Sequence, residues 1–206
     1  MLTLDRTRDI LSDAAGRRFD PQQRSWSETT ASSGEPVSLA AAVNWLQHES
    51  KHPLRAPIAV IGPRDASSPQ YDCAETMGAG LAEMGLAVAC GGRTGVMEAV
   101  CRGVSHKGGI AIGILPDADP GLANPYVSVA LATGIGEARN ALVARAGICL
   151  VAIGNSYGTL SEVALGLQFG KPVFGLMGAA QVDGVVHCPG PAEALQAVAR
   201  CVLALP

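Results

Sequence analysis

Residues 148–170, ICLVAIGNSYGTLSEVALGLQFG, decide the fold of this chain. The apolar run that ends at Ile153 predicts a buried strand, and the stretch from Tyr157 predicts a helix that ends near Gly170. The same alternation recurs from Pro57 onward, with further strands expected in PIAVIGP, LAVAC, GIAIGILP, YVSVALATG and KPVFGLM. Continuous apolar strands that alternate with helices are typical of a parallel sheet covered on both faces. The pattern therefore predicts an α/β fold with a doubly wound, Rossmann-like parallel sheet.

The composition agrees with a globular fold and excludes several classes of protein. Of 206 residues, 48% are hydrophobic and 16% charged, which is enough apolar material for a buried core and excludes a disordered chain. Lys and Arg number 15 against 18 Asp and Glu, so no basic surplus exists for binding nucleic acid by bulk charge. The N-terminus is charged throughout, and no apolar run approaches the roughly 18 residues of a membrane span. We therefore expect a cytoplasmic protein without a membrane segment.

The cysteines indicate neither a disulfide framework nor a metal site. The chain has six, with no CxxC pair and no Cys/His cluster: Cys73, Cys90, Cys101, Cys149, Cys188 and Cys201. Cys90 and Cys149 stand in apolar, strand-like runs, where cysteine acts as a small hydrophobic residue. We expect free thiols and no bound metal.

The first 55 residues differ in character from the rest of the chain. We expect a helical N-terminal extension and linker in residues 1–55 and the Rossmann-like domain in residues 56–206. The elements expected within the extension are a charged helix over residues 3–17, a polar linker over 22–37 and a second helix over 38–50 with Ser38 as its N-cap. Such an extension is expected to pack on the core or on a second subunit.

Glycine-rich strand ends are the candidate ligand site, because ligands of such sheets bind beyond the carboxyl ends of the strands. Three ends carry unusual residues: Gly62-Pro63, residues 91–95 (GGRTG) and residues 154–159 (GNSYGT). The last two lead directly into helices, and a glycine-rich turn before a helix N-terminus suits a phosphate. Two such loops in one sheet favour a phosphorylated ligand over turn chemistry alone. The residues expected to bind it include Gly62, Gly91, Gly92, Gly95, Asn155, Ser156, Tyr157, Gly158 and Thr159.

Other motif interpretations fit less well. The 91–95 loop is not GxGxxG, and Gly170-Lys171 is followed by proline, so it is no P-loop. GNSYG does match the GxSxG nucleophile elbow of esterases, with Asp183 and His187 following Ser156 in triad order. No HGGG-type oxyanion segment is visible, and an esterase would leave the 91–95 loop without a role. The esterase interpretation is therefore disfavoured.

Two charged residues are candidates for the chemistry at this edge. Arg139 lies near the start of a helix that follows a strand, and Glu162 lies one turn into the helix after Thr159. A surface arginine and a first-turn glutamate that favours the helix dipole are the simpler interpretations. Placement favours function, because both would face the same crevice as the two glycine-rich loops.

Two stretches, GGRTGVMEAVCRG (residues 91–103) and GEARNALVARAGICLVAIGNSYGTLSEVALGLQFGKPVFGL (residues 136–176), resemble the "lonely guy" superfamily, whose members have also carried the label lysine decarboxylase. Its enzymes are nucleoside 5′-monophosphate phosphoribohydrolases with the hallmark PGGxGTxxE, preceded by an arginine on the previous helix. Residues 158–162 (GTLSE) match GTxxE, and Arg139 stands at the arginine position. The resemblance covers residues 57–178 and is closest to a Rossmann-fold subgroup near the molybdenum cofactor carrier proteins.

The resemblance implies two functions. As a phosphoribohydrolase, the protein would use Glu162 as the carboxylate beside the ribose and Arg139 to orient the nucleotide, with Met97 lining the phosphate pocket; no cofactor and no lysine decarboxylase activity are expected. The alternative is a non-enzymatic carrier or sensor of a phosphorylated nucleotide or molybdopterin-type ligand. Asn155 and Ser156 replace two glycines of the enzyme hallmark and Asn140 replaces a lysine, which slightly favours the carrier. Relatives also imply a homodimer or homotetramer.

Overall fold

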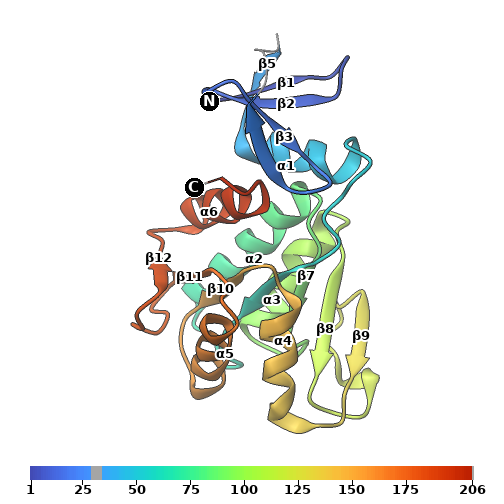
Figure 1. The fold of residues 1–206 in the computed structure, drawn as a ribbon. Helices are drawn as coiled ribbons and strands as arrows, with labels where there is room; N and C mark the ends of the chain where they lie inside the picture. Colours follow the sequence, from blue (N-terminus) through green and yellow to red (C-terminus); the bar gives the residue numbers. More distant parts are fainter. Residues whose placement is uncertain (29–33, 206) are drawn as a thin grey trace. The chain divides into compact units, whose positions relative to one another are not determined.

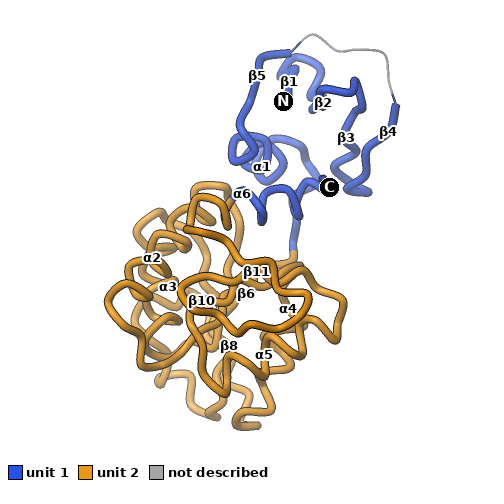
Figure 2. Tube along the Cα trace, turned by 90° about the vertical axis from the view of Figure 1, so that its left-hand side faces the viewer, with its two compact units in different colours: residues 1–55, 196–206 blue, residues 56–195 orange. Residues whose placement is uncertain are grey.

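The structure, a computed structural model, describes residues 1–28 and 34–205. They form two compact units (Figure 2): unit 1 consists of Met1–Arg55 and Gln196–Pro206, and unit 2 of Ala56–Leu195. The division after Arg55 lies where the sequence changes character. The sequence pattern does not reveal that the end of the chain joins unit 1. The middle of the expected linker, residues 29–33, lies outside the described residues.

Unit 2 is built on a seven-stranded sheet whose neighbouring strands all run parallel (Figure 1). Its strands are β6 (Ile58–Ile61), β7 (Val88–Cys90), β8 (Ala111–Leu115), β9 (Val129–Ala132), β10 (Leu150–Ile153), β11 (Val173–Leu176) and β12 (Val185–His187). Its helices are α2 (Ser68–Glu83), α3 (Val96–His106), α4 (Asn140–Ala146), α5 (Tyr157–Gln168) and the start of α6 (Pro191–Val202), with short 3-10 turns η1 (Pro120–Leu122) and η2 (Gly136–Arg139). The predicted α/β fold is confirmed, and the short edge strand β12 is an element that the sequence pattern did not indicate.

The order of the strands in the sheet indicates where a ligand crevice lies. The sheet runs β12-β11-β10-β6-β7-β8-β9. The chain moves outward from β6 through β7, β8 and β9, then returns to the other side of β6 with β10 and continues outward. The direction therefore reverses between β6 and β10. In an open parallel sheet the ligand crevice lies at this reversal, beyond the carboxyl ends of the two strands.

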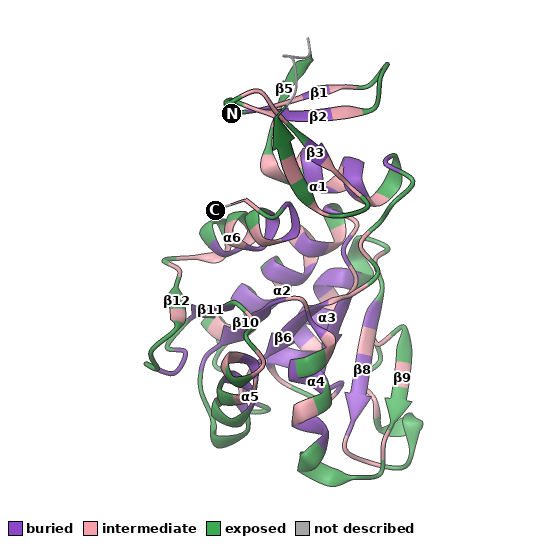
Figure 3. Ribbon diagram, in the orientation of Figure 1, coloured by how far each residue is buried: buried purple, intermediate pink, exposed green. Residues whose placement is uncertain are grey.

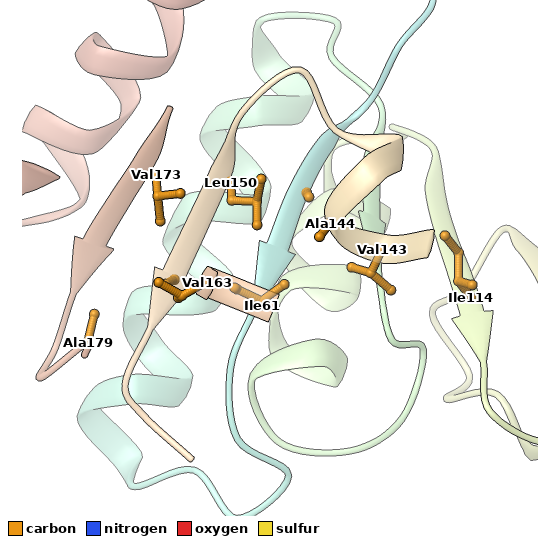
Figure 4. Packing of buried hydrophobic residues seen from close by; sticks show 10 residues of the cluster. Ile61, Ile114, Val143, Ala144, Leu150, Val163, Val173 and Ala179 are labelled. Carbon is orange, nitrogen blue, oxygen red and sulfur yellow. The ribbon is translucent and has the colours of Figure 1, made fainter. Parts of the chain in front are cut away.

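Helices cover both faces of this sheet and bury its central strands. α2 and α3 pack together on one face, and α4 and α5 lie on the other (Figure 1). The central strands β6, β10 and β11 are buried along their whole length, whereas the edge strands β9 and β12 are largely exposed (Figure 3). Figure 4 shows Val143 and Ala144 of α4 packed over the sheet near Ile61, with Val163 of α5 in the same buried cluster. The loops that follow β6 and β10 thus leave a fixed platform.

Unit 1 is not the helical extension that the sequence predicted, because most of its elements are strands. It contains a five-stranded antiparallel sheet in the order β4-β3-β2-β1-β5. Its elements are β1 (Leu2–Asp5), β2 (Ile10–Asp13), β3 (Arg17–Asp20), β4 (Ser25–Glu28), β5 (Glu35–Val37) and α1 (Leu39–His48). The predicted helix over residues 3–17 is wrong, because this stretch is a strand pair, and the predicted linker over 22–37 contains two strands.

The sequence of residues 2–20 explains why this stretch forms strands β1 to β3 instead of a helix. Leu2 and Leu4 are buried while their neighbours are partly exposed, which is the period of two that a strand requires. Three aspartates, each at the end of a strand, then turn the chain. The side chain of Asp5 accepts the N–H groups of residues 7 and 8, Asp13 those of 15 and 17, and Asp20 those of 22 and 23. Such side-chain-capped turns stabilise a meander of short strands instead of a helix.

The second expected helix is confirmed. α1 begins at Leu39, and the Ser38 hydroxyl accepts the N–H of Ala41 at 3.1 Å, as an N-cap does. Trp45 of this helix is buried, and its indole N–H donates to Oδ1 of Asp9 at 2.6 Å. The helix is thereby fixed to the turn between β1 and β2.

The end of the chain completes unit 1 through the last carbonyls of α6. Arg24 donates from Nε to the carbonyl of Val202 at 2.9 Å and from Nη2 to that of Cys201 at 2.7 Å. Trp26 donates its indole N–H to the carbonyl of Leu203 at 2.7 Å. The final carbonyls of a helix lack intrahelical partners, and a cation there also opposes the negative end of the helix dipole.

Candidate functional site

A pocket of about 700 Å³ opens at the reversal between β6 and β10. Its walls come from the segments that follow β6, β7 and β10, together with η2 and the first turns of α4 and α5. The residues that line it are Ile61, Gly62, Pro63, Arg64, Asp65, Gly91, Met97, Glu137, Arg139, Asn140, Asn155, Ser156, Tyr157, Gly158, Thr159, Ser161 and Glu162. The structure thus brings ten of the twelve residues singled out from the sequence to one pocket; Gly92 and Gly95 are outside its lining.

The loop after β7 has a structural task that the sequence did not indicate. Gly95 has φ of +69°, and a Cβ there would collide with the carbonyl oxygens of Pro63 and Arg64. The N–H of Val96, at the start of α3, donates to the carbonyl of Pro63 at 3.1 Å. Gly92 packs against Leu115 and Gly113 instead of the pocket. The 91–95 loop therefore fixes the loop after β6. Of its three glycines, which were expected to bind the ligand, only Gly91 lines the pocket.

Arg139 and Glu162 form a buried ion pair at the inner end of the pocket. The Arg139 side chain donates from Nη1 to Oε1 of Glu162 at 3.1 Å and to Oδ1 of Asn140 at 2.6 Å. The two residues are only 3% and 6% exposed. Gly91 makes room for the guanidinium, since a Cβ there would come 2.5 Å from Nη2 of Arg139 and 2.7 Å from Sδ of Met97. The surface-arginine interpretation is therefore wrong.

One donor of this pair is left without a protein acceptor. Nε of Arg139 is buried and forms no hydrogen bond within the described part of the chain. A buried polar group without a partner costs free energy, on the order of 1–3 kcal/mol, and native structures rarely keep one without a reason. Because Arg139 lines the pocket, an acceptor atom of a ligand there would satisfy this donor.

The carboxyl of Glu162 is poised between its two protonation states. Burial raises the pKa of Glu162 to about 7, the nearby Arg139 guanidinium opposes the rise, and the negative charge of Glu137 adds to it. Glu137 itself pairs with Arg64 at 3.0 Å on the exposed rim of the pocket. A carboxyl with such a pKa can accept or donate a proton near neutral pH.

The N-terminus of α5 forms the outer wall. Ser156 caps the helix, because its hydroxyl accepts the N–H of Thr159 at 3.1 Å and lies 2.8 Å from the Thr159 hydroxyl. The N–H groups of Tyr157 and Gly158 come before the first intrahelical hydrogen bond and line the pocket. The positive end of the helix dipole and these donors suit a phosphate or another anion.

A short chain of polar side chains links the two ends of the pocket. Asn140 accepts from Arg139 and donates through Nδ2 to Oγ of Ser161 at 2.9 Å. The Ser161 hydroxyl donates to the carbonyl of Gly158 at 2.7 Å. The sequence singled out Asn140 only as a replaced lysine and did not indicate Ser161. Ser161 follows Tyr157 by four residues, and residues at this spacing lie on one face of a helix. This spacing could have placed Ser161 beside Tyr157 at the pocket.

The sequence also missed three rim residues of the pocket: Arg64, Asp65 and Glu137. Arg64 and Asp65 stand in the loop after β6 and Glu137 in η2, and the sequence pattern does not show that these segments meet. The esterase alternative finds no support within residues 1–28 and 34–205. The Ser156 hydroxyl bonds within its own helix turn, and neither Asp183 nor His187 lines the pocket.

The described residues contain neither a metal cluster nor a membrane-spanning helix. No group of three or more His, Cys, Asp or Glu side chains among them could hold a metal ion. None of their helices combines the length and the apolar character that crossing a membrane requires. All six cysteines are free thiols, with Cys90 and Cys149 buried as expected.

Comparison with known proteins settles the family. A model of the SLOG cluster4 family matches residues 55–197. This chain belongs to the SLOG cluster4 family. The match spans all of unit 2, whereas residues 1–54 and 198–206 lie outside it.

Relatives of this SLOG protein include an uncharacterized protein of Archaeoglobus fulgidus, which is 36% identical over 138 residues, or 67% of this chain and 91% of the relative. Among solved structures, the molybdenum cofactor binding protein of Rippkaea orientalis has a TM-score of 0.67 and 31% identity, and the match covers 70% of this chain and 96% of that one. The molybdenum cofactor carrier protein of Chlamydomonas reinhardtii has a TM-score of 0.67 and 33% identity, covering 73% and 100%. The expected resemblance to the "lonely guy" group near these carriers is confirmed.

Proposed function

We propose that this protein binds a phosphorylated, nucleotide-sized cofactor in the pocket between β6 and β10 and releases it intact. Arg139 carries the proposal: a buried guanidinium lines the pocket and keeps one donor, Nε, without a protein acceptor. What distinguishes this donor is its place, because the guanidinium that carries it lines the pocket. A ligand that presents an oxygen or nitrogen acceptor at this depth completes the arrangement.

The dimensions and chemistry of the pocket support such a ligand. Its volume, about 700 Å³, is within the range of roughly 300–1,000 Å³ typical of small-molecule sites. The N-terminus of α5, with Ser156 and Gly158, would hold the phosphate, and Arg139 with Glu162 would hold the polar edge of a ring. A molybdopterin-type ligand carries both a phosphate and a polar ring edge, and its redox chemistry would serve whichever protein receives it. The similarity to the cofactor-binding protein of Rippkaea orientalis supports this choice.

Purification under anaerobic conditions tests the carrier function. Absorbance and mass spectrometry of the full chain are expected to detect a phosphorylated small molecule, or its uptake when molybdopterin cofactor is added. Arg139→Gln should bind it at least about tenfold more weakly, because the buried donor is lost. Failure of the wild-type protein to retain or take up any phosphorylated ligand would contradict the proposal.

Hydrolysis of a nucleoside 5′-monophosphate is the second candidate function, and the pKa of Glu162 near 7 is the observation that favours it. Water would add to C1′ of the ribose as the C1′–N bond breaks, and the Glu162 carboxylate would accept one proton of that water. The leaving base would take a proton from solvent, and Glu162 would later return its proton to solvent, so the net reaction consumes one water. A panel of AMP, GMP, IMP, CMP, UMP and a cytokinin ribotide, followed by chromatography of the free base, tests this. Base released by the wild type but not by Glu162→Gln would replace the carrier function by this one.

The assembly of several chains is also part of the proposal. Tyr157, Leu142 and Leu160 of α4 and α5 are 95%, 45% and 36% exposed in the single chain, although all are large and apolar or aromatic. Burying such side chains against a second copy would be favourable. Light scattering of the purified protein should give the mass of a homodimer or homotetramer, and a monomeric mass would contradict this part.

A further inference from the structure

Unit 1 contains a pocket of its own, which neither the family match nor the proposed function uses. It has a volume of about 520 Å³ and lies wholly within residues 8–52. Its walls come from the turn between β1 and β2, from β3 and the turn that follows it, from β4, and from the segment after α1. Phe19 and Ser50, both nearly inaccessible to solvent, line it together with exposed charged residues.

The two acidic residues of this pocket already serve the fold. Asp9 accepts the indole N–H of buried Trp45 at 2.6 Å. Asp20 accepts the backbone N–H groups of Gln22 and Gln23 at 2.8 and 3.0 Å. One oxygen of each carboxylate is therefore engaged in hydrogen bonds that hold the fold of unit 1.

The basic residues of the pocket are, in contrast, uncommitted. The side chains of Arg18, Lys51 and His52 form no ion pair or hydrogen bond within the described ranges, and Arg8 reaches only Asp5, at 3.9 Å. The other arginines on the strands and turns of this unit are all bound internally. Arg6 pairs with Glu35 and Glu49, Arg17 with Asp13, and Arg24 with the carbonyls at the end of α6.

This contrast points to an anion. Four basic side chains line one concavity from three separate segments, while each of the two acidic neighbours uses one carboxylate oxygen in hydrogen bonds of the fold. Exposed cations that converge without partners repel one another, and an anion bound among them removes that repulsion. Arginine and lysine together offer the forked and single donors that phosphate and carboxylate oxygens accept.

We infer that this pocket of unit 1 is a second binding site, for a small polyanion held by Arg8, Arg18, Lys51 and His52. The site is independent of the pocket in unit 2, so either can fail without the other. Its volume suits a molecule of about the size of a di- or triphosphate with a small organic group. Bound there, the anion would join the β1–β2 turn, β3 and the segment after α1.

The two tryptophans of the chain give this site a specific signal. Both lie in unit 1: Trp45 donates to Asp9 of the pocket, and Trp26 packs against Phe19 of the pocket with ring centroids 5.1 Å apart. Unit 2 has no tryptophan. Intrinsic tryptophan fluorescence therefore reports the unit 1 pocket even when the same anion also enters the pocket of unit 2.

The experiment titrates the full chain with inorganic tripolyphosphate, and separately with citrate, at constant ionic strength. We expect a saturable change of tryptophan fluorescence, with an affinity that falls about tenfold in the double variant Arg18→Gln, Lys51→Gln. Arg55→Gln is the matched control, because Arg55 is an exposed cation of the same unit that does not line the pocket. It should bind as the wild type does.

The outcomes separate the sources of the anion and decide the inference. Saturation by tripolyphosphate alone identifies a phosphate ligand, and saturation by citrate as well identifies a broader polyanion site. Absence of a saturable change with both anions would overturn the inference. Equal affinities in the wild type and in the double variant would overturn it too, because the uncommitted cations would then play no part.

Discussion

Arg139 and Glu162 show what single residues contribute to this pocket. Each is buried, each needs the other for charge compensation, and together they retain one unsatisfied donor and one carboxyl with a raised pKa. A buried ion pair of this kind adds little to stability, because the cost of desolvation offsets most of the attraction. The pair is therefore better explained by what it offers a ligand than by what it adds to the fold.

The pH dependence of stability tests the state of Glu162. Its pKa is raised in the folded protein to about 7 from the ordinary value of 4.5, so the protonated carboxyl is the form that folding favours. The stability that this group contributes is therefore complete below about pH 4.5 and is lost as pH rises through 7. Relative to Glu162→Gln, the wild type should lose up to about 3 kcal/mol of unfolding free energy between pH 4.5 and pH 8. Urea denaturation of both proteins across this range measures it, and a constant difference between them would contradict the raised pKa.

Gly91→Ala tests the position of Arg139 without changing any charge. The new Cβ would come 2.5 Å from Nη2 of Arg139, so the guanidinium must shift away from Glu162. We expect ligand affinity to fall about tenfold or more, measured by calorimetry with whichever ligand the purified protein retains. Gly190→Ala is a suitable control, since its Cβ would meet only the mobile carboxylate end of Glu193 at 3.3 Å. Equal losses in both variants would show that Gly91 has no special role.

At the scale of elements, the sequence predicted unit 2 well because its central strands β6, β7, β10 and β11 are buried along their whole length. Apolar runs such as that ending at Ile153 leave little choice between strand and exposed loop. β12 escaped notice because it is short and lies at an exposed edge. The rim of the pocket escaped notice because Arg64 and Glu137 meet only through the fold, 73 positions apart in sequence.

Unit 1 shows where reasoning from single residues fails. Residues 3–17 contain many charged groups that suit a helix, but the alternation around Leu4 and the aspartate at each strand end indicate a meander. Asp5, Asp13 and Asp20 recur at intervals of eight and seven residues, and this regular spacing was the available signal. Helix α1 was predicted correctly because Ser38 marks its start.

The N-cap of α5 offers a test at this scale. Ser156→Ala removes the acceptor of the Thr159 N–H and should cost about 1 kcal/mol of unfolding free energy. Ser38→Ala removes the equivalent cap of α1, which lies in unit 1, at a similar cost. Only Ser156→Ala should also weaken ligand binding, because only that hydroxyl lines the pocket. Unchanged ligand affinity in Ser156→Ala would argue against a phosphate at this helix terminus.

At the scale of the whole molecule, the chain combines a family domain with a unit that the family match does not include. Unit 1 is closed by residues from both ends of the chain, since Arg24 and Trp26 bind the last carbonyls of α6. No local pattern predicts such a contact, because its partners are 177 and 178 positions apart. The match to the SLOG cluster4 family, which begins at residue 55, likewise gives no information on the function of unit 1.

Deletion of residues 196–206 tests this closure. The deletion removes the acceptor of the Trp26 indole and the buried side chains of Val198, Val202 and Leu203. We expect tryptophan fluorescence to shift to longer wavelength and unit 1 to unfold at lower denaturant concentration, because both tryptophans report that unit. A truncated protein with the spectrum and denaturation midpoint of the full chain would show that unit 1 folds without the C-terminus.

The central claim is that the pocket of unit 2 holds a phosphorylated ligand and returns it unchanged. The most direct measurement loads the protein with its phosphorylated ligand, removes free ligand, incubates the complex, releases the ligand by mild denaturation and determines its mass. We expect recovery of the intact phosphorylated molecule from the wild type and little retention by Arg139→Gln. Recovery of a free base together with ribose 5-phosphate from the wild type would contradict it and identify the protein as a hydrolase.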